Sequence, residues 1–270
     1  MALSYYNDDM SWAMRRRILY ILGIFIFFAL VIGLPLAIYF HQPASCHDGV
    51  QNQNETSPDH GGPCVILDER ALTPNAILWT RAFKVRDGLY DATAYVLNPN
   101  ETAGVVTPVS YQLGLYDNDN VLVVERTGAT YLMPGGITPV FEGGIDIGNR
   151  TVARARFQFT EPMMWDRVLK NITSSIEVND KQIADTTTEP RLRAEVMNKS
   201  VEDLIQIVFV ATVFDQADNA FASSATALPR LNAGETQQIV FTWSAPFTAT
   251  VGRIDIIPSY PPTIDPAAAK

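Results

Sequence analysis

ILYILGIFIFFALVIGLPLAIYF, residues 18–40, contains no charged side chain and is almost wholly apolar. A helix rises about 1.5 Å per residue, so this stretch spans roughly 34 Å, whereas the hydrocarbon core of a bilayer is about 30 Å thick. Its length and its lack of a polar face disfavour a buried core helix. The stretch therefore predicts a transmembrane helix over residues 18–40.

The charges beside this stretch predict its orientation. Arg15, Arg16 and Arg17 adjoin it on the N-terminal side, and the next basic residue is Arg70. By the positive-inside rule, residues 1–17 form a cytoplasmic tail and everything after residue 40 lies outside the cytoplasm. We therefore expect a single-pass protein of the cell membrane with extracytoplasmic domains.

A cleaved signal peptide is the main alternative to an anchor. Its apolar segment has about 7–15 residues and ends at a small-residue cleavage site. Ala44-Ser45-Cys46 supplies small residues before a cysteine, as a bacterial lipoprotein signal does, but Pro43 stands where such a signal has Leu. The length of the apolar stretch favours an uncleaved signal anchor.

The charge balance narrows the range of partners. The formal net charge is −9, and the tail carries two Asp against three Arg, which leaves −10 for the region after the anchor. An acidic surface argues against nucleic acid or anionic lipid as the main partner. Residues 41–270 are long enough for two ordinary domains.

Residues 41–65 are polar and rich in turn-forming residues, which predicts a stalk without a core. Cys46 and Cys64 lie close together there, on the side of the membrane where disulfides persist. A disulfide between them would stabilise the fold by about 3 kcal/mol in the chain-entropy model. A zinc site that adds His47 and His60 is the alternative, but the adjacent Cys46 and His47 lack the usual ligand spacing. We favour the disulfide.

The stalk resembles a short module of bacterial surface proteins with the pattern C-x-DG-x-x-N-x-x-E-x-x-x-D-x-GG-x-C. The residues that fit this pattern are Cys46, Asp48, Gly49, Asn52, Glu55, Asp59, Gly61, Gly62 and Cys64. Hard oxygen ligands of this kind suit Ca²⁺, although plain turns use the same residue types for local hydrogen bonds. The candidate calcium ligands are Asp48, Asn52, Asn54, Glu55 and Asp59.

An internal repeat follows the stalk. LWTRAFK at 78–84 returns as MWDRVLK at 164–170, AYVLN at 94–98 returns as AEVMN at 194–198, and LGLYD at 113–117 returns as ATVFD at 211–215. The landmarks of the two copies are Trp79 and Trp165, Asn98 and Asn198, and Asp117 and Asp215. We expect each Trp near the start of a domain, as a core or inter-domain anchor.

Each copy has the pattern of β-structure. Apolar residues alternate at 111–115, 208–214 and 239–243, and Asp- and Asn-rich turns at 117–120 and 215–219 separate apolar runs. The fold class is therefore mainly β, with one N-terminal transmembrane helix followed by two tandem antiparallel β-sandwiches. We expect the sandwiches at 66–160 and 161–260, followed by a Pro/Ala-rich tail at 261–270.

The two copies resemble the FxLYD-type immunoglobulin-like domain of prokaryotic envelope proteins. LGLYD at 113–117, a following turn, and LNAGET at 231–236 before an alternating strand carry the resemblance. Leu113 and Ala211 stand where the family has its leading Phe. The resemblance implies two tandem immunoglobulin-like sandwiches at an extracytoplasmic site, and it implies no catalytic residues.

The usual catalytic motifs are missing from the two copies. All three His and both Cys lie in the stalk, and the chain has no Gly-rich phosphate loop and no HExxH motif. We therefore expect a non-enzymatic protein, with calcium as its one candidate cofactor.

The expected function is structural or binding. The partners would be the lipid bilayer, through residues 18–40, and a protein of a cell-envelope assembly, with no nucleic acid. An accessory subunit of a membrane enzyme, or of a secretion or pilus machine, is the alternative; it would act through its transmembrane helix.

Overall fold

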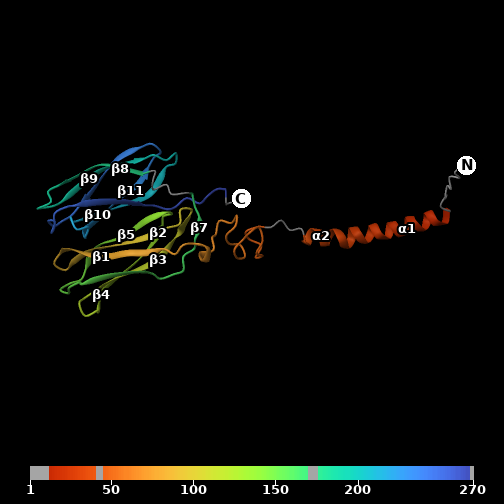
Figure 1. Cartoon of the computed structure of the whole chain (residues 1–270), viewed down its shortest axis with the longest axis horizontal. Helices are drawn as coiled ribbons and strands as arrows, with labels where there is room; N and C mark the ends of the chain where they lie inside the picture. Colours follow the sequence, from red (N-terminus) through yellow and green to blue (C-terminus); the bar gives the residue numbers. More distant parts are fainter. Residues whose placement is uncertain (1–11, 41–44, 170–175, 268–270) are drawn as a thin grey trace, which may run out of the picture. The chain divides into compact units, whose positions relative to one another are not determined.

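The computed structural model describes residues 12–40, 45–169 and 176–267 (Figure 1). It divides into two compact units, Met1–Ser45 and Cys46–Lys270. Parts of the predicted cytoplasmic tail (1–11), stalk (41–44) and Pro/Ala-rich tail (268–270) lie outside the described residues, as does the end of the second Trp motif at residue 170.

The first unit contains one continuous helix, as predicted. It consists of α1 (Trp12–Phe28), the π-helical turn η1 (Ala29–Gly33) and α2 (Leu34–Phe40). Leu34 donates its N–H to the Ala29 carbonyl, five residues back, directly before Pro35, whose nitrogen has no proton to donate. By length and composition, Trp12–Ala37 can cross a membrane as an anchor or serve as a signal sequence.

The second unit is mainly β, which confirms the predicted fold class (Figure 1). In the first sandwich, β1 (Ala76–Arg86), β2 (Leu89–Asn98) and β5 (Gly136–Asp146) form one sheet, and β4 (Leu122–Leu132), β3 (Ala103–Tyr116) and β6 (Arg154–Phe159) form the other. The second sandwich pairs β8 (Ile176–Ala184), β9 (Arg191–Asn198) and β12 (Thr236–Thr242) against β11 (Ala220–Leu231), β10 (Leu204–Phe214) and β13 (Arg253–Ser259). The two sandwiches thus have the same strand order.

Each sandwich has its own apolar core. Val96 of β2 and Leu113 of β3 are fully buried in the first, and Phe209 of β10 and Phe241 of β12 are nearly so in the second. Met133, which follows β4, packs into the core of the second sandwich. The two cores are therefore separate but interlocked.

The repeated tryptophans occupy different positions in the two sandwiches. Trp165 is 3% exposed and lies in the core of the first sandwich. The short strand β7 (Asp166–Arg167) follows it and pairs with β3. Trp79 lies instead on β1, where the two sandwiches meet. The chain thus returns to the first sandwich before β8 begins. The expectation that Trp165 starts the second sandwich is therefore wrong.

The sheet β1-β2-β5 packs against the sheet β11-β10-β13. Trp79 and Phe83 of the first sandwich contact Phe214 and Ala220 of the second in a small apolar cluster. β2 is consequently covered on both of its faces, as is most of β10. The alternating residues 208–214, which predict a strand, therefore face the neighbouring sandwich rather than their own core.

Buried hydroxyl groups join the two sheets. Thr93 and Ser223 are 0% and 1% exposed, and their side-chain oxygens lie 2.9 Å apart in a hydrogen bond. Ser223 Oγ also donates to the Ala211 carbonyl at 3.1 Å. Because water is excluded here, a hydroxyl that lost its partner would remain unsatisfied.

Replacing Ser223 should weaken the contact between the sandwiches. We expect Ser223→Ala to lower the free energy of unfolding by about 1–3 kcal/mol, because it leaves Thr93 without its acceptor. Ser224→Ala is the matched control: the Ser224 hydroxyl bonds the Thr242 carbonyl in an exposed position, so we expect a change within about 0.5 kcal/mol. Urea unfolding of the full chain in detergent measures both, and equal losses would contradict the prediction.

Candidate functional site

The disulfide predicted in the stalk is present. Cys46 and Cys64 are joined with their Cα atoms 5.5 Å apart, which closes residues 46–64 into a loop that we call the stalk loop. Arg167 of β7 donates from Nη2 to the Gly62 carbonyl at 2.7 Å and from Nε to the Cys64 carbonyl at 3.3 Å. The stalk loop is therefore held against the first sandwich and belongs to the same compact unit.

The carboxylates of the stalk loop accept hydrogen bonds from its own backbone. Asp59 accepts the N–H groups of Asp48 at 2.9 Å and Gly49 at 3.0 Å. Glu55, which is 5% exposed, accepts the N–H groups of Asn52 at 3.1 Å and Asp59 at 3.2 Å. Asp48 accepts the Asn52 side-chain amide at 2.9 Å. These hydrogen bonds engage Asp48, Glu55 and Asp59 within the loop itself.

One trio of ligand-type side chains converges within 4.8 Å in the described part of the chain: Cys46, Glu55 and Cys64. The two cysteines have no thiolate to offer, because they are bonded to each other. Asn54 is exposed, in a left-handed backbone conformation with φ +66°. Calcium binding stays a prediction for the five candidate ligands, Asp48, Asn52, Asn54, Glu55 and Asp59. To bind the ion, the carboxylates would have to give up hydrogen bonds from backbone N–H groups.

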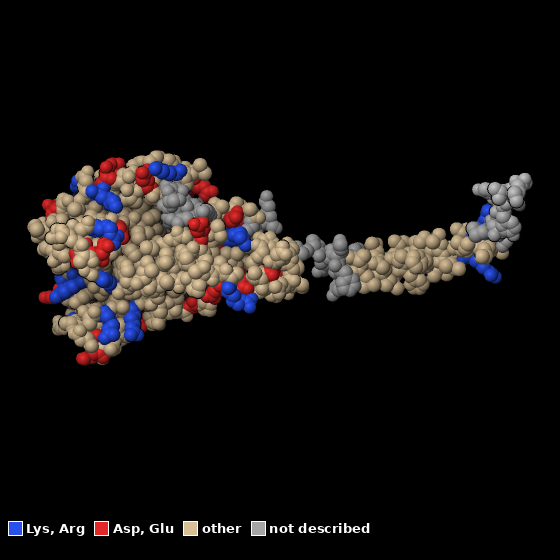
Figure 2. Space-filling view, viewed as in Figure 1, with Lys and Arg blue, Asp and Glu red and all other residues tan. Residues whose placement is uncertain are grey.

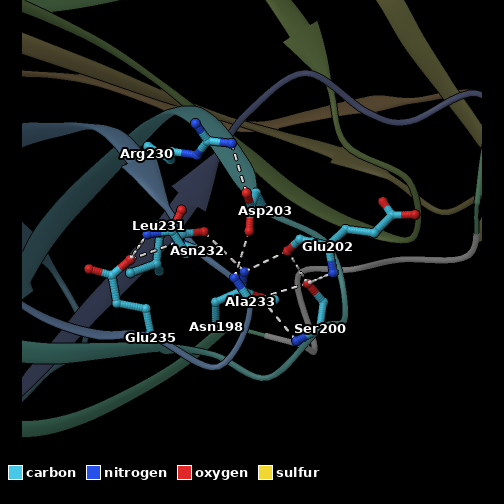
Figure 3. A network of polar contacts seen from close by, with 9 residues as sticks. All are labelled: Asn198, Ser200, Glu202, Asp203, Arg230, Leu231, Asn232, Ala233 and Glu235. Atoms are coloured by element: carbon cyan, nitrogen blue, oxygen red, sulfur yellow. Dashed lines mark hydrogen bonds and ion pairs between the residues drawn. The ribbon is translucent and has the colours of Figure 1, made fainter.

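The repeated asparagines close corresponding ends of the two sandwiches. Asn198 is 0% exposed and donates from Nδ2 to the carbonyls of Glu202 at 2.7 Å and Leu231 at 3.1 Å, while its Oδ1 accepts the N–H of Ser200 at 2.9 Å (Figure 3). Beside it, Asp203 is bonded to the Ala233 N–H and paired with Arg230 (Figure 3). These partners lower the pKa of Asp203.

Asn98 makes the same kind of contacts in the first sandwich. It is 0% exposed, its Nδ2 donates to the carbonyls of Ala103 at 2.7 Å and Met133 at 2.9 Å, and its Oδ1 accepts the N–H of Asn100 at 3.0 Å. The Asn landmarks of the repeat therefore have one shared structural role: each holds two strand ends together.

The repeated aspartates shape corresponding turns. Asp117 Oδ1 accepts the N–H groups of Asp119 and Val121, both at 2.9 Å. Asp215 Oδ1 accepts those of Ala217 and Asn219, both at 2.8 Å. Such turns are a local use of Asp, so these landmarks organise hairpins rather than a chemical site.

A pocket opens where the two sandwiches meet, and we call it the seam pocket. Its volume is about 210 Å³. The first sandwich contributes Phe83, Lys84 and Asp91, and the second contributes Phe221, Trp243 and Phe247. It is smaller than the roughly 300–1,000 Å³ of a pocket for a drug-sized ligand, but its aromatic lining, its few polar groups and its place between two domains are typical of ligand sites.

The aromatic wall of the seam pocket is held in place by hydrogen bonds. Trp243 donates from Nε1 to the Ser223 carbonyl at 2.9 Å, and the Phe247 N–H donates to the Thr186 carbonyl at 2.9 Å. The Phe247 ring packs edge-to-face against those of Phe221 and Trp243, with centroids 5.3 and 5.1 Å apart. The wall is therefore fixed before any ligand arrives.

The two charged residues of the seam pocket differ in their partners. Lys84 pairs with Asp87 at 2.7 Å, which raises the pKa of Lys84. Asp91 accepts one N–H, from Gly144 at 2.8 Å, and its burial raises the pKa of its carboxyl group. Among the described residues, no Lys or Arg pairs with Asp91. The pocket thus holds one carboxylate without a cationic partner.

Sequence reasoning did not identify this pocket. Its residues come from β1, β2, β11 and the loop after β12, and only the stacking of the sheets brings them together. In the sequence, Trp243 is marked only by its place at the end of the alternating residues 239–243. The one available signal was the aromatic pair in WSAPF at 243–247, a loop sequence with two large rings around a proline.

Replacing the buried asparagines should destabilise the sandwiches to a similar degree. We expect Asn98→Ala and Asn198→Ala each to lower the free energy of unfolding by about 2–4 kcal/mol. Asn98 donates to the carbonyls of the buried residues Ala103 and Met133, and Asn198 donates to that of the buried Leu231. Asn118→Ala, at an exposed turn position, should change it by less than about 0.5 kcal/mol. Urea unfolding of the three variants measures this, and a near-neutral Asn198→Ala would refute the shared role.

Calcium should bind the stalk loop weakly. We expect a dissociation constant of about 0.1–1 mM, as in extracellular calcium modules, because the ion has to displace backbone N–H groups. Isothermal titration of the full chain with Ca²⁺ measures it, and Asp59→Asn should reduce the heat. No heat at millimolar Ca²⁺ would rule the site out.

No family model matches this chain, and no curated protein matches it. The likenesses to the FxLYD-type domain and to the bacterial stalk module therefore rest on the sequence motifs alone. Four features of the structure bear on function: the apolar helix, the disulfide-closed stalk loop, the two stacked sandwiches and the seam pocket between them.

Proposed function

We propose that this protein is a membrane-anchored, extracytoplasmic binding protein of a prokaryotic cell envelope. Its two sandwiches, which we assign to the FxLYD type, would be displayed outside the membrane and would bind another component of an envelope assembly. The observation that carries this proposal is the combination of a membrane-length helix with a compact β unit that has a preformed pocket at an inter-domain seam.

The chemistry of the pocket favours binding over catalysis. Its titratable side chains are Lys84 and Asp91, and Lys84 is already engaged by Asp87. General acid–base or nucleophilic catalysis needs a second group within reach of the first. A single carboxylate beside aromatic rings can recognise a ligand, but it has no partner with which to transform one.

The helix supports a second candidate function, an accessory subunit that acts through its anchor. The described residues of α1 include none that is buried, and a Cβ at Gly23 or Gly33 would meet nothing within 4 Å. Small residues at such positions allow another helix to approach closely. In this case the membrane segment, and not the β unit, would select the partner.

Crosslinking in native membranes separates the two functions. We expect mass spectrometry to find reproducible links between residues 46–270 and one set of envelope proteins. A chain whose residues 18–40 are replaced by an unrelated transmembrane helix should retain these links, because the β unit makes the contacts.

A fusion of the native helix to an unrelated ectodomain is the reciprocal control. If this fusion captures the same proteins and the helix-exchanged chain does not, the accessory-subunit function replaces the binding function. Links confined to the chain itself would contradict both functions.

A further inference from the structure

We propose that the seam pocket binds an alkylammonium group, the positively charged head of a lysine-like or choline-like ligand. This inference deepens the binding function proposed above and rests on it. It names the chemical class that the pocket selects and the residues that select it, with Asp91 as the ion-pairing group and the rings of Phe221, Trp243 and Phe247 as the wall.

The carboxylate of Asp91 supplies the charge. Carboxylates are seldom withdrawn from water without a partner, and this one, which is half-buried, receives a single hydrogen bond from Gly144. It lies opposite Phe83 in the register of β1 and β2, so it belongs to the same lining as the aromatic residues. A cationic ligand would give Asp91 the partner that the described residues do not provide.

The aromatic wall suits a cation that carries aliphatic carbon. The face of an aromatic ring is negative and attracts an ammonium or alkylammonium group, and Trp is the strongest of the aromatic side chains in this respect. The chain already uses this interaction once near the seam, where the Arg253 guanidinium lies 3.9 Å from the Phe214 ring centroid. Among the described residues, no Lys or Arg makes such a cation–π contact with the rings of Phe221, Trp243 or Phe247.

The remaining charges favour a cation over an anion. Lys84, the basic residue of the lining, is paired with Asp87. The whole chain carries a formal net charge of −9, which raises the local concentration of cations and lowers that of anions. Figure 2 shows acidic and basic side chains interspersed on the visible face of the β unit.

Binding of three small probes tests the proposal on the full chain in a polyoxyethylene detergent, which contains neither amine nor sugar. The probes are choline, Nα-acetyl-lysine amide and 3,3-dimethyl-1-butanol, the uncharged analogue of choline. Saturation-transfer NMR titrations give their dissociation constants. We expect one of the two cations to bind at least about tenfold more tightly than the uncharged analogue. Preference for choline would indicate a headgroup-like ligand, and preference for the lysine amide a protein side chain.

Variants of the pocket identify the residues responsible. Asp91→Asn keeps the side-chain shape and an acceptor for Gly144, and we expect it to weaken cation binding at least about tenfold. Phe221→Leu, which keeps an apolar wall without a ring, should weaken it about threefold or more. Asp119→Asn removes the same charge from an exposed turn and should leave binding unchanged. Thermal melting of each variant verifies that it folds.

Three outcomes would overturn the proposal: equal binding of choline and its uncharged analogue, unchanged binding by a folded Asp91→Asn, or no binding of either cation. The crosslinking experiment remains independent of them. If Asp91→Asn retains the crosslinks of the native chain, the envelope-binding function stands and the alkylammonium site falls. If the native chain forms no crosslinks but binds choline, the site stands and the proposed protein partner falls.

Discussion

The face-to-face contact between the sheets β1-β2-β5 and β11-β10-β13 determines the rest of this structure. It buries Thr93, Ser223 and Thr212 almost completely, together with the aromatic contact between Trp79 and Phe214. Separation of the sandwiches would expose these rings and break the hydrogen bond between the Thr93 and Ser223 hydroxyl groups. The duplicated domains therefore form one compact unit, and the seam pocket exists only because they do.

The same contact makes the two copies unequal. Phe214 of β10 is 5% exposed at the inter-sandwich contact, beneath the Arg253 guanidinium. At the corresponding place on β3, Tyr116 lies beneath Arg156 but is only half-buried. The outward face of β6 also carries Arg154, and that of β9 carries Arg191 and Arg193, all exposed. Glu195 is exposed on the same face of β9, so the outward faces carry charged side chains, and burying these charges would oppose the stacking of a further copy.

Much of the fold followed from local patterns. The apolar run predicts the helix because burial in a bilayer depends on the composition of one continuous segment. The Asn pair (Asn98 and Asn198) and the Asp pair (Asp117 and Asp215) recur because each residue makes its hydrogen bonds within its own turn or strand end. Similar local sequences therefore place these residues in similar surroundings. Trp79 and Trp165 share a motif but not a position, because the partners of a large ring are set by distant strands.

The amino-acid sequence by itself determined the membrane-length helix, the disulfide between Cys46 and Cys64, the β-sandwich fold class and the duplication, since each depends on spacing and periodicity along the chain. The tertiary structure alone decided which sheet of each sandwich meets the other, where Trp165 packs, and that Asp91 lies among Phe221, Trp243 and Phe247. These features arise from packing between strands far apart in the chain, and no local pattern encodes the surface that a strand's second face will meet.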